Sequence, residues 1–447
     1  MASTVFESAF FRDMFGTAPM RAVFSDASLV ARYVEVEAAL ARAQGSLGVI
    51  PAQAAAEITR RAADFTADLE RMKRETEVVG YPILPLVQQL AAHCGEAGRY
   101  LHWGATTQDV MDNAVVLQLR DALALVEADV AALRDILAAL AQRHRDTPMA
   151  GRTHLQQALP VTFGYKAAVW LSMFDRHAER LRQAAPRVLV GQFGGAAGTL
   201  ASLGERGLEV RAALMRELRL GEASITWHVA RDGLAEAVQL LGLVTGSLAK
   251  IATDVMLMMS TEYGEVAEPF VHGRGASSTM PQKRNPISSE LILAAARIVR
   301  QQAGLMLDAM VQDFERATGP WHLEWAAIPE AFLASASALH QARFMLAGLE
   351  VDAQRMRGNL ALTRGLIVAE AVMMGLAPYL GRQAAHDVVY DACRAVAANG
   401  GELVDALAAR AEVSAHLDRA RLEALLEPSN YLGAAGAMVD AVLGARR

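Results

Sequence analysis

The stretch VLQLRDALALVEADVAALRDILAAL, residues 116–140, decides the fold class of this chain. Its apolar residues recur at alternating intervals of three and four, at Val116, Leu119, Leu123, Val126, Val130, Leu133, Leu137 and Leu140. This spacing keeps the apolar side chains on one narrow face of a helix, as in long helices that pack at shallow angles. The stretch therefore predicts a long helix within a bundle.

The placement of proline supports this prediction. The chain has 14 prolines, yet residues 86–147 and 187–268 contain none. Because proline interrupts helix interiors, these gaps permit helices of about 25 residues or more. The second gap carries a similar apolar stripe at Leu234, Val238, Leu241, Val244, Leu248, Ile251, Val255 and Met258. We expect both helices to lie in the core of the bundle.

Shorter segments flank the predicted bundle. Prolines break the helical pattern before residue 105, and glycines and prolines break it again after residue 350. We therefore expect an all-α fold with three helical domains. These are an N-terminal domain over 1–105, a central long-helix bundle with the active-site regions over 106–350, and a C-terminal domain over 351–447.

Charge and cysteine content exclude several function classes. The net charge of −6 gives no basic field for a nucleic acid, so we expect no nucleic-acid partner. Cys94 and Cys393 lie far apart without a metal-binding spacing, which indicates a reducing compartment and no metal. Charged residues interrupt the first 15 positions, so we expect no secretory signal, no membrane segment and a cytoplasmic protein.

Three polar segments interrupt the helical pattern, and the first is LHWGATTQDVMDNA, residues 101–114. Thr107 or Asp109 can cap the long helix that follows, which is the ordinary role of such residues. Thr106, Thr107 and Gln108 also offer hydroxyl and amide groups that suit a carboxylate. The segment is therefore either a helix cap or part of an anion pocket.

The second segment is AGRTHLQQALPVTFG, residues 150–164, which we interpret as a turn into a helix. A single histidine is more often an ordinary surface or core residue than a catalyst. Thr153 and His154 together at a helix entrance can nevertheless bind an anion and transfer a proton.

The third segment is GRGASSTMPQKRNP, residues 273–286. Its glycines and prolines are typical of a surface loop. An ordinary loop seldom combines Met280 with paired serines, Lys283 and Asn285. A mobile lid that carries a serine and cations to a bound anion explains this mixture better.

The third segment resembles the signature of the fumarase/aspartase superfamily, roughly G-S-S-x-M-P-x-K-x-N-P, except that Ala276 replaces the first glycine. The other two segments occur in the order and spacing of that family's remaining active-site regions. Over nearly its full length the chain is most similar to the 3-carboxy-cis,cis-muconate cycloisomerase branch, through FFRDMFGTAPMRAVFSD, LVGQFGGAAGTLASLG and GPWHLEWAAIPE. Adenylosuccinate lyase is a more distant relative.

The resemblance implies a mechanism and a role for each matching residue. A base removes a proton next to a carboxylate, and the resulting aci-carboxylate expels the leaving group, so prepositioned donors and cations must hold the added charge. Ser277 corresponds to the base, and Lys283 supplies positive charge. The implied substrate ligands are Thr106, Thr107, Gln108, Thr153, Ser278, Thr279, Met280, Gln282 and Asn285. The family analogy also implies a homotetramer whose active sites are shared between subunits, without a cofactor.

Three residues depart from the cycloisomerase pattern. His154 stands where cycloisomerases usually have tryptophan, and Glu290 lies where elimination lyases have the partner of that histidine. Gln282 replaces the histidine of cycloisomerases and resembles argininosuccinate lyases. A His–Glu pair would raise the imidazole pKa and suit proton donation. We therefore count His154 and Glu290, with Ser277 and Lys283, as the candidate catalytic residues.

These features predict a β-elimination lyase that cleaves a C–N bond of an N-substituted aspartate or related succinyl compound and releases fumarate. Iminodisuccinate-, nitrosuccinate- and adenylosuccinate-like compounds are candidate substrates. The alternative is 3-carboxy-cis,cis-muconate cycloisomerase itself, and a non-catalytic structural role is the third possibility. Arg231 and the WHLEW group, with His322 and Glu324, are further candidates for substrate contact, although a packed or solvated role suits each equally well.

Overall fold

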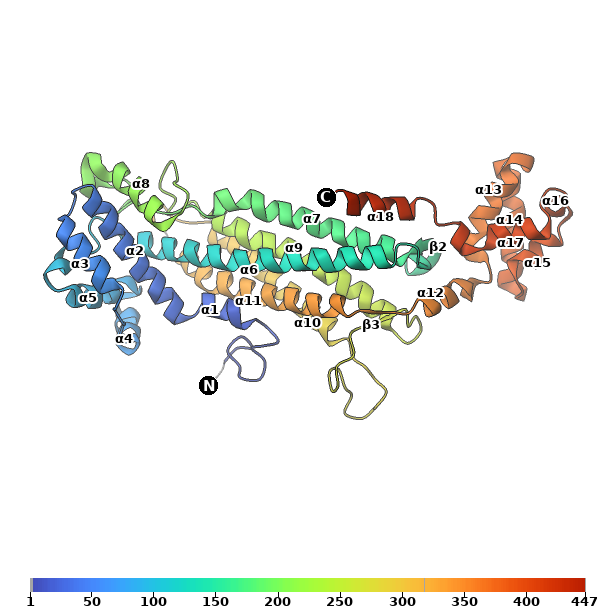
Figure 1. Cartoon of the computed structure of the whole chain (residues 1–447), viewed down its shortest axis with the longest axis horizontal. Helices are drawn as coiled ribbons and strands as arrows, with labels where there is room; N and C mark the ends of the chain where they lie inside the picture. Colours follow the sequence, from blue (N-terminus) through green and yellow to red (C-terminus); the bar gives the residue numbers. More distant parts are fainter. Residues whose placement is uncertain (1–2, 317, 447) are drawn as a thin grey trace. The chain divides into compact units, whose positions relative to one another are not determined.

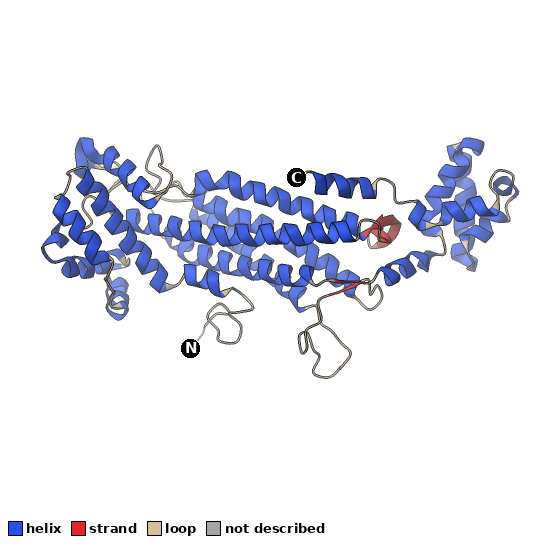
Figure 2. Ribbon diagram, viewed as in Figure 1, coloured by secondary structure: helices blue, strands red, loops and turns tan. Residues whose placement is uncertain are grey.

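A computed structural model describes residues 3–316 and 318–446 of the chain. Nearly all regular structure in these residues is helical, as Figure 2 shows. The strands are short and form two antiparallel pairs: β1 (Pro148–Thr153) with β2 (Gln156–Thr162), and β3 (Val266–Ala267) with β4 (Glu350–Val351). The predicted all-α fold class is confirmed.

The longest helices agree with the proline-free gaps. They are α6 (Thr107–Arg143), α7 (Phe163–Val188), α9 (Asp232–Met259), α10 (Ile287–Ala309) and α11 (Pro320–Ala347), labelled in Figure 1. The predicted seam is buried in α6, where Leu119, Leu133 and Leu137 are all 0% exposed. The stripe of α9 is buried as well. Apolar spacing alone therefore located the two helices that the sequence marked most strongly.

The contacts divide the chain into two compact units, each assembled from three separate segments. Unit 1 comprises Met1–Val130, His177–Leu248 and Leu291–His340, and unit 2 comprises Ala131–Arg176, Ala249–Glu290 and Gln341–Arg447. Each long helix contributes one part to each unit. Each predicted domain is one continuous segment of the chain, whereas each compact unit combines three segments. The division into three domains stays a prediction.

Unit 1 contains the shorter helices of the first part of the chain. They are α1 (Ala18–Val23), α2 (Asp26–Ser46), α3 (Ala52–Ala62), α4 (Leu69–Val79), α5 (Ile83–Cys94), η1 (Gly95–Tyr100), η2 (Ala201–Arg206) and α8 (Gly207–Leu218). Side chains cap several of these helices, since Ser25 accepts from the amide of Ser28 and Asp68 from that of Arg71. Their apolar faces share one core, which includes Leu40.

Unit 2 contains the β1–β2 hairpin, the β3–β4 pair and the shorter helices of the last part of the chain. These helices are α12 (Ala353–Leu360), η3 (Ala361–Thr363), η4 (Leu366–Val368), α13 (Ala369–Leu380), α14 (Arg382–Asn399), α15 (Leu403–Ala408), α16 (Ala411–Ser414), α17 (Arg419–Leu426), η5 (Pro428–Asn430) and α18 (Ala435–Gly444). Helices α13 to α17 enclose a core of their own, in which Leu376 and Leu403 are fully buried.

Helix α9 is long and apolar enough by length and composition to cross a membrane, with a mean hydropathy of 1.5 in its most apolar window. Within this chain, 44% of that window is buried. The buried side includes the seam residues Val238, Leu241 and Leu248. A narrow buried stripe is what a helix that packs on its neighbours through one face requires.

Candidate active site

Thr106 and Thr107 lie at the start of α6, in unit 1. The helix begins at Thr107, and the carboxylate of Asp109 reaches back to accept the amide N–H of Thr106 at 3.0 Å. This contact is one half of a capping box, so capping by Asp109 is confirmed. The hydroxyl oxygen of Thr106 accepts a hydrogen bond from Nη1 of Arg316 at 2.6 Å. A cation therefore lies directly against the predicted carboxylate ligand.

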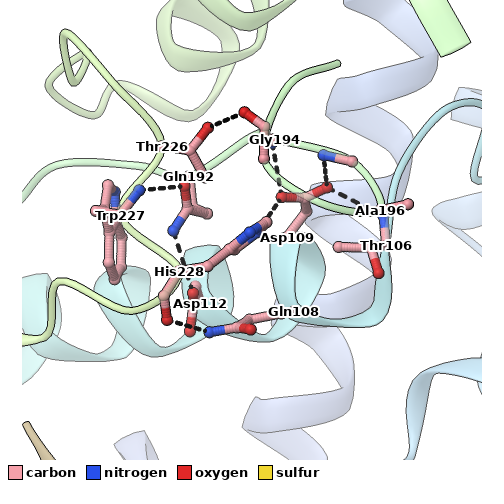
Figure 3. A network of polar contacts seen from close by, with 12 residues as sticks. Thr106, Gln108, Asp109, Asp112, Gln192, Gly194, Ala196, Thr226, Trp227 and His228 are labelled. Atoms are coloured by element: carbon pink, nitrogen blue, oxygen red, sulfur yellow. Dashed lines mark hydrogen bonds and ion pairs between the residues drawn. The ribbon is translucent and has the colours of Figure 1, made fainter. Parts of the chain in front are cut away.

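Asp109 is the centre of a buried network, shown in Figure 3. Its Oδ1 lies 2.8 Å from the amide nitrogen of Gly194 and 2.9 Å from Nε2 of His228. Its Oδ2 accepts the amides of Thr106 and of Gly195, the latter at 2.9 Å. Four donors thus satisfy a carboxylate that is only 1% exposed. The network fixes the start of α6, the glycine-rich segment over residues 191–198 (the glycine segment) and His228 relative to one another.

The glycine segment allows this close approach. A Cβ atom at Gly191 would lie 2.2 Å from the sulfur of Met215, and one at Gly194 would lie 2.7 Å from a methyl group of Thr226. Only glycine fits at both positions. Arg316 donates through Nη2 to the carbonyls of Gly195 and Ala196, so the segment also orients the guanidinium beside Thr106.

Gln108 does not point into an open pocket. Its side chain is fully buried, and Nε2 donates to the carbonyl oxygen of His228 at 2.8 Å. Oε1 is buried without a hydrogen-bond partner among the described residues. The amide nitrogen of Gln108 therefore holds His228 in this structure, and the prediction that Gln108 binds substrate stays a prediction.

Arg231 also has a different role from the predicted one. Its guanidinium is 1% exposed and makes paired hydrogen bonds to two carboxylates, with Asp112 at 2.8 Å and with Glu324 at 2.6 and 2.7 Å. Burial lowers its pKa, but the charges of both carboxylates outweigh burial and leave the pKa raised. Arg231 has no free donor face for a substrate, and its predicted substrate contact is corrected to a structural ion triad.

His102 and Arg316 are residues of unit 1 that the sequence analysis missed. His102 has a positive φ of 58°, and its Nδ1 lies 2.6 Å from the buried carboxylate of Glu37. Arg316 lies three residues before the first glycine of the GPWHLEW group. Neither contact could be found from spacing, since each joins segments that are distant in the sequence.

The pair of His102 and Glu37 gives a testable pH dependence. Burial lowers the pKa of His102, but the charge and hydrogen bond of Glu37 outweigh burial and leave this pKa raised. The stabilisation is therefore fully present below the ordinary histidine pKa of about 6.5 and is lost as the pH rises through the raised pKa. His102→Asn should lower the free energy of unfolding by about 1.5–3 kcal/mol at the acidic end only, since Asn tolerates positive φ.

Denaturant unfolding of wild type and His102→Asn at a series of pH values measures this difference in the free energy of unfolding. Glu37→Gln should remove the same pH dependence, because it removes the charge that His102 faces. A constant difference between wild type and His102→Asn from acid to alkaline pH would contradict the assignment.

Thr153 and His154 lie at the tip of the β1–β2 hairpin, in unit 2. The sequence predicts a plain turn into a helix here, so the hairpin is a correction. Thr153 pairs with Gln156, which leaves His154 and Leu155 as the two-residue turn, with φ of 52° and 64°. Such a turn normally takes Asn and Gly, and each non-glycine residue at positive φ costs about 1–3 kcal/mol. The exposed His154 is thus held in a strained conformation, which is typical of functional sites.

A buried ion pair holds the hairpin in place. The guanidinium of Arg152 makes paired hydrogen bonds to Glu265 at 2.6 and 2.8 Å, and Asn359 donates to the same carboxylate at 2.8 Å. Arg152 also lies over the ring of Tyr263, with its guanidinium carbon 4.4 Å from the ring centroid. These contacts fix the end of β1 next to the turn, directly before Thr153.

The predicted lid is a loop between β3 and α10, and Figure 1 shows it extending away from the helices that flank it. Arg284 anchors one side, donating to the carbonyl of Glu268 at 2.7 Å and pairing with Glu350. Arg274 anchors the other, donating to Ser288 and Gln341 at 2.7 Å each. The ends of the loop are therefore fixed, whereas the segment between them carries the predicted catalytic residues.

Ser277 lies within this loop and is half-buried. Its hydroxyl oxygen accepts the amide N–H of Met280 at 3.1 Å and that of Thr279 at 3.3 Å. Hydrogen bonds that donate to an oxygen favour its ionised form, so both amides favour the alkoxide that a serine base requires. Thr279 and Met280 thus assist through their backbone, while Met280 exposes its side chain.

The other predicted loop residues are open to solvent or partly so. Lys283, Ser278 and Gln282 are exposed, and Asn285 is half-buried, with its amide donating to the carbonyl of Gly275 at 2.9 Å. Among the described residues, the ammonium group of Lys283 has no hydrogen-bond partner. The structure therefore shows no contact between Lys283 and Ser277, and the electrostatic support of Ser277 by Lys283 stays a prediction.

Glu290 is exposed in the first turn of α10. In the described part of the chain, His154 and Glu290 form no hydrogen bond or ion pair with each other, although both belong to unit 2. The predicted pair is therefore absent within one chain. Both side chains are free to meet groups from another molecule.

No group of three or more His, Cys, Asp or Glu side chains among residues 3–316 and 318–446 is arranged to hold a metal ion.

Comparisons with known proteins agree over almost the whole chain. Residues 15–300 match a family model described as lyase, and residues 365–442 match one described as adenylosuccinate lyase C-terminus. The crystal structure of a fumarate lyase from Mesorhizobium sp. BNC1 is 60% identical, with a TM-score of 0.92, and the match covers 97% of this chain and 99% of that one.

Two curated relatives carry other activities in their names. A 3-carboxy-cis,cis-muconate cycloisomerase from Pseudomonas aeruginosa is 50% identical over 96% of this chain and 94% of its own length. A trans-aconitate decarboxylase 1 from Mycosarcoma maydis is 49% identical over 96% of this chain and 88% of its own length. This chain is thus similar to proteins that are named for three different activities.

Proposed function

This chain belongs to the fumarase/aspartase superfamily of lyases, and we propose that it eliminates an amine from an N-substituted aspartate, with release of fumarate. The observation that carries the proposal is the environment of Ser277, whose hydroxyl oxygen accepts two loop amides within the family's signature segment. The similarity to a fumarate lyase supports the same reaction.

The proposed reaction is balanced by groups that copies of this chain supply. The Ser277 alkoxide takes the proton from the carbon next to one carboxylate, and the electron pair moves into that carboxylate to give an aci-carboxylate. Its collapse forms the C=C bond of fumarate and breaks the C–N bond. The departing amine takes a proton from His154, and Thr106, Thr153 and Arg316 bind the two carboxylates.

The names of the curated relatives support a more specific substrate class. Both trans-aconitate and 3-carboxy-cis,cis-muconate carry three carboxylates. These compounds appear in the names of two relatives that are 49% and 50% identical to this chain. We therefore favour an N-substituted aspartate whose amine carries a further carboxylate, as iminodisuccinate does. The alternative is the lactonising cycloisomerase reaction, which the similarity to the cycloisomerase favours.

A substrate screen tests both reactions. Purified protein is incubated with iminodisuccinate, nitrosuccinate and 3-carboxy-cis,cis-muconate, and fumarate and muconate are quantified by chromatography. Fumarate formed from a succinyl amine supports the elimination. Loss of muconate without fumarate supports the cycloisomerase, and no turnover of any compound would overturn both.

We further propose that the active site is completed by other copies of the chain in a homotetramer. His154 and Glu290 are exposed and unpaired with each other within the described chain, and the hairpin tip exposes Leu155 to 77%. Apolar side chains are also exposed along α9 and α10, including Leu243 at 51% and Leu307 at 53%. Burial of such faces against identical faces is a common way to form symmetric oligomers.

Mixing inactive variants tests the shared site. Ser277→Ala and His154→Ala should each be inactive alone, and subunit exchange between them should restore part of the activity if hairpin and loop come from different copies. A mixture of Ser277→Ala with Lys283→Met, both in the loop, is the matched control and should stay inactive. Exchange proven by native mass spectrometry without any recovery of activity would contradict the proposal.

A further inference from the structure

Unit 2 contains a cationic cavity beside the hairpin. Its volume is about 440 Å³, and its lining residues come from the hairpin, the first turns of α7 and the last part of α9. Thr153 is one of them, so the cavity adjoins a predicted substrate ligand. The charged lining consists of Arg152, Lys166, Lys250 and Asp254, which leaves an excess of positive charge.

Lys166 differs from the other cations of this cavity. Arg152 is committed to Glu265, and Lys250 pairs with Asp254 at 2.5 Å. Asp254 also accepts the indole N–H of Trp170 at 3.2 Å. Among the described residues, the ammonium group of Lys166 has neither a hydrogen bond nor an ion pair, although its side chain is half-buried.

The position of Lys166 in its helix is electrostatically unfavourable. Lys166 lies in the first turn of α7, where the helix dipole is positive, and this turn contains no acidic residue. The neighbouring amides cannot offset this, since those of Phe163, Gly164 and Tyr165 already donate to Thr147, His144 and Thr162. Burial lowers the pKa of Lys166, Asp254 opposes this, and Lys250 and Arg152 lower the pKa further. A bound anion would offset the unfavourable interactions with Lys250, Arg152 and the helix dipole.

We propose that Lys166 binds a third carboxylate, carried by the leaving-group half of the substrate. The proposal rests on the proposed function, and it identifies the substrate as a succinyl amine with at least three carboxylates. Thr153 binds the succinyl half from the end of β1, and Lys166 lines the same cavity from the first turn of α7. The aliphatic lining, with Val161 and Val169, holds the carbon chain between the two ends.

Binding of stable analogues tests the assignment. Tricarballylate has three carboxylates and glutarate has two, and calorimetry compares their affinities in the full-length protein. The wild type should prefer tricarballylate roughly 10- to 100-fold, which is the effect of one hydrogen bond to a charged group. Lys166→Met should lose this preference, and Lys166→Arg should retain most of it. Lys73→Met is the matched control, because Lys73 is an exposed lysine of α4 in unit 1.

Chemical labelling of the wild type provides a second measurement that does not depend on activity. The chain has four lysines, so acylation by acetic anhydride can be followed at each by peptide mass spectrometry. Tricarballylate should protect Lys166 and leave Lys73 unaffected. Protection without any fumarate-releasing activity would refute the proposed function and keep the carboxylate site. Absence of protection together with unchanged binding by Lys166→Met would overturn the inference.

Discussion

Ser277→Ala should lower kcat by roughly 10²- to 10⁴-fold and leave binding of substrate analogues within a small factor of wild type. The estimate is the usual contribution of a positioned general base. The alanine side chain lacks the oxygen that accepts the amides of Thr279 and Met280, so the proposed base is lost. Steady-state kinetics with the substrate found by the screen measures kcat, and calorimetry with tricarballylate measures binding.

Ser278→Ala is the matched control for this prediction. Ser278 is the neighbouring serine, it is exposed, and the substitution has the same size. As a substrate ligand it should raise KM and change kcat much less. If Ser277→Ala retained full kcat, or if Ser278→Ala alone abolished it, the assignment of Ser277 as the base would be wrong.

The long helices could be predicted from the sequence because their signal is local and repeated. The seam of α6 recurs every three or four residues, and no proline interrupts it. The three polar segments were found for a related reason, since each is a visible interruption of that periodicity. Such patterns require only the chain's own spacing, so one sequence was sufficient to identify α6, α9 and the loop that contains Ser277.

The hairpin could not be predicted in the same way. Its two-residue turn consists of His154 and Leu155, both at positive φ, whereas turn prediction relies on Asn and Gly. Local propensity therefore pointed away from the observed turn. The anchoring pair of Arg152 and Glu265 joins residues 113 positions apart, and only the structure reveals it.

The roles of the buried polar residues required the structure as well. In the sequence, Arg231 and Gln108 are polar residues near active-site segments, which is equally consistent with substrate binding and with a packed role. Burial decides for Arg231, whose guanidinium is 1% exposed and is fully paired with two carboxylates. Gln108 retains a buried amide oxygen without a hydrogen-bond partner among the described residues, so its substrate contact stays a prediction. Thr106 has a hydroxyl that faces the cation of Arg316.

Arg231→Leu should lower the free energy of unfolding by about 3–5 kcal/mol, the largest stability effect that we expect from one substitution. The guanidinium is the shared partner of Asp112 and Glu324, whose side chains are 2% and 3% exposed. Its removal leaves two buried carboxylates facing each other without a cation. Replacing both carboxylates in the same protein, with Asp112→Asn and Glu324→Gln, should recover part of the loss, since no uncompensated charge then remains.

Arg284→Leu is the matched control, because Arg284 pairs with Glu350 where the two side chains are 38% and 49% exposed. Solvent screens such a pair, so its loss should cost less than about 1 kcal/mol. Denaturant unfolding of the variants gives the comparison directly. Equal losses for Arg231→Leu and Arg284→Leu would show that the triad of Arg231, Asp112 and Glu324 is not the buried ionic centre of unit 1. A large loss for Arg231→Leu that the two neutralising substitutions relieve would show that unpaired charge, and not lost packing, is its cause.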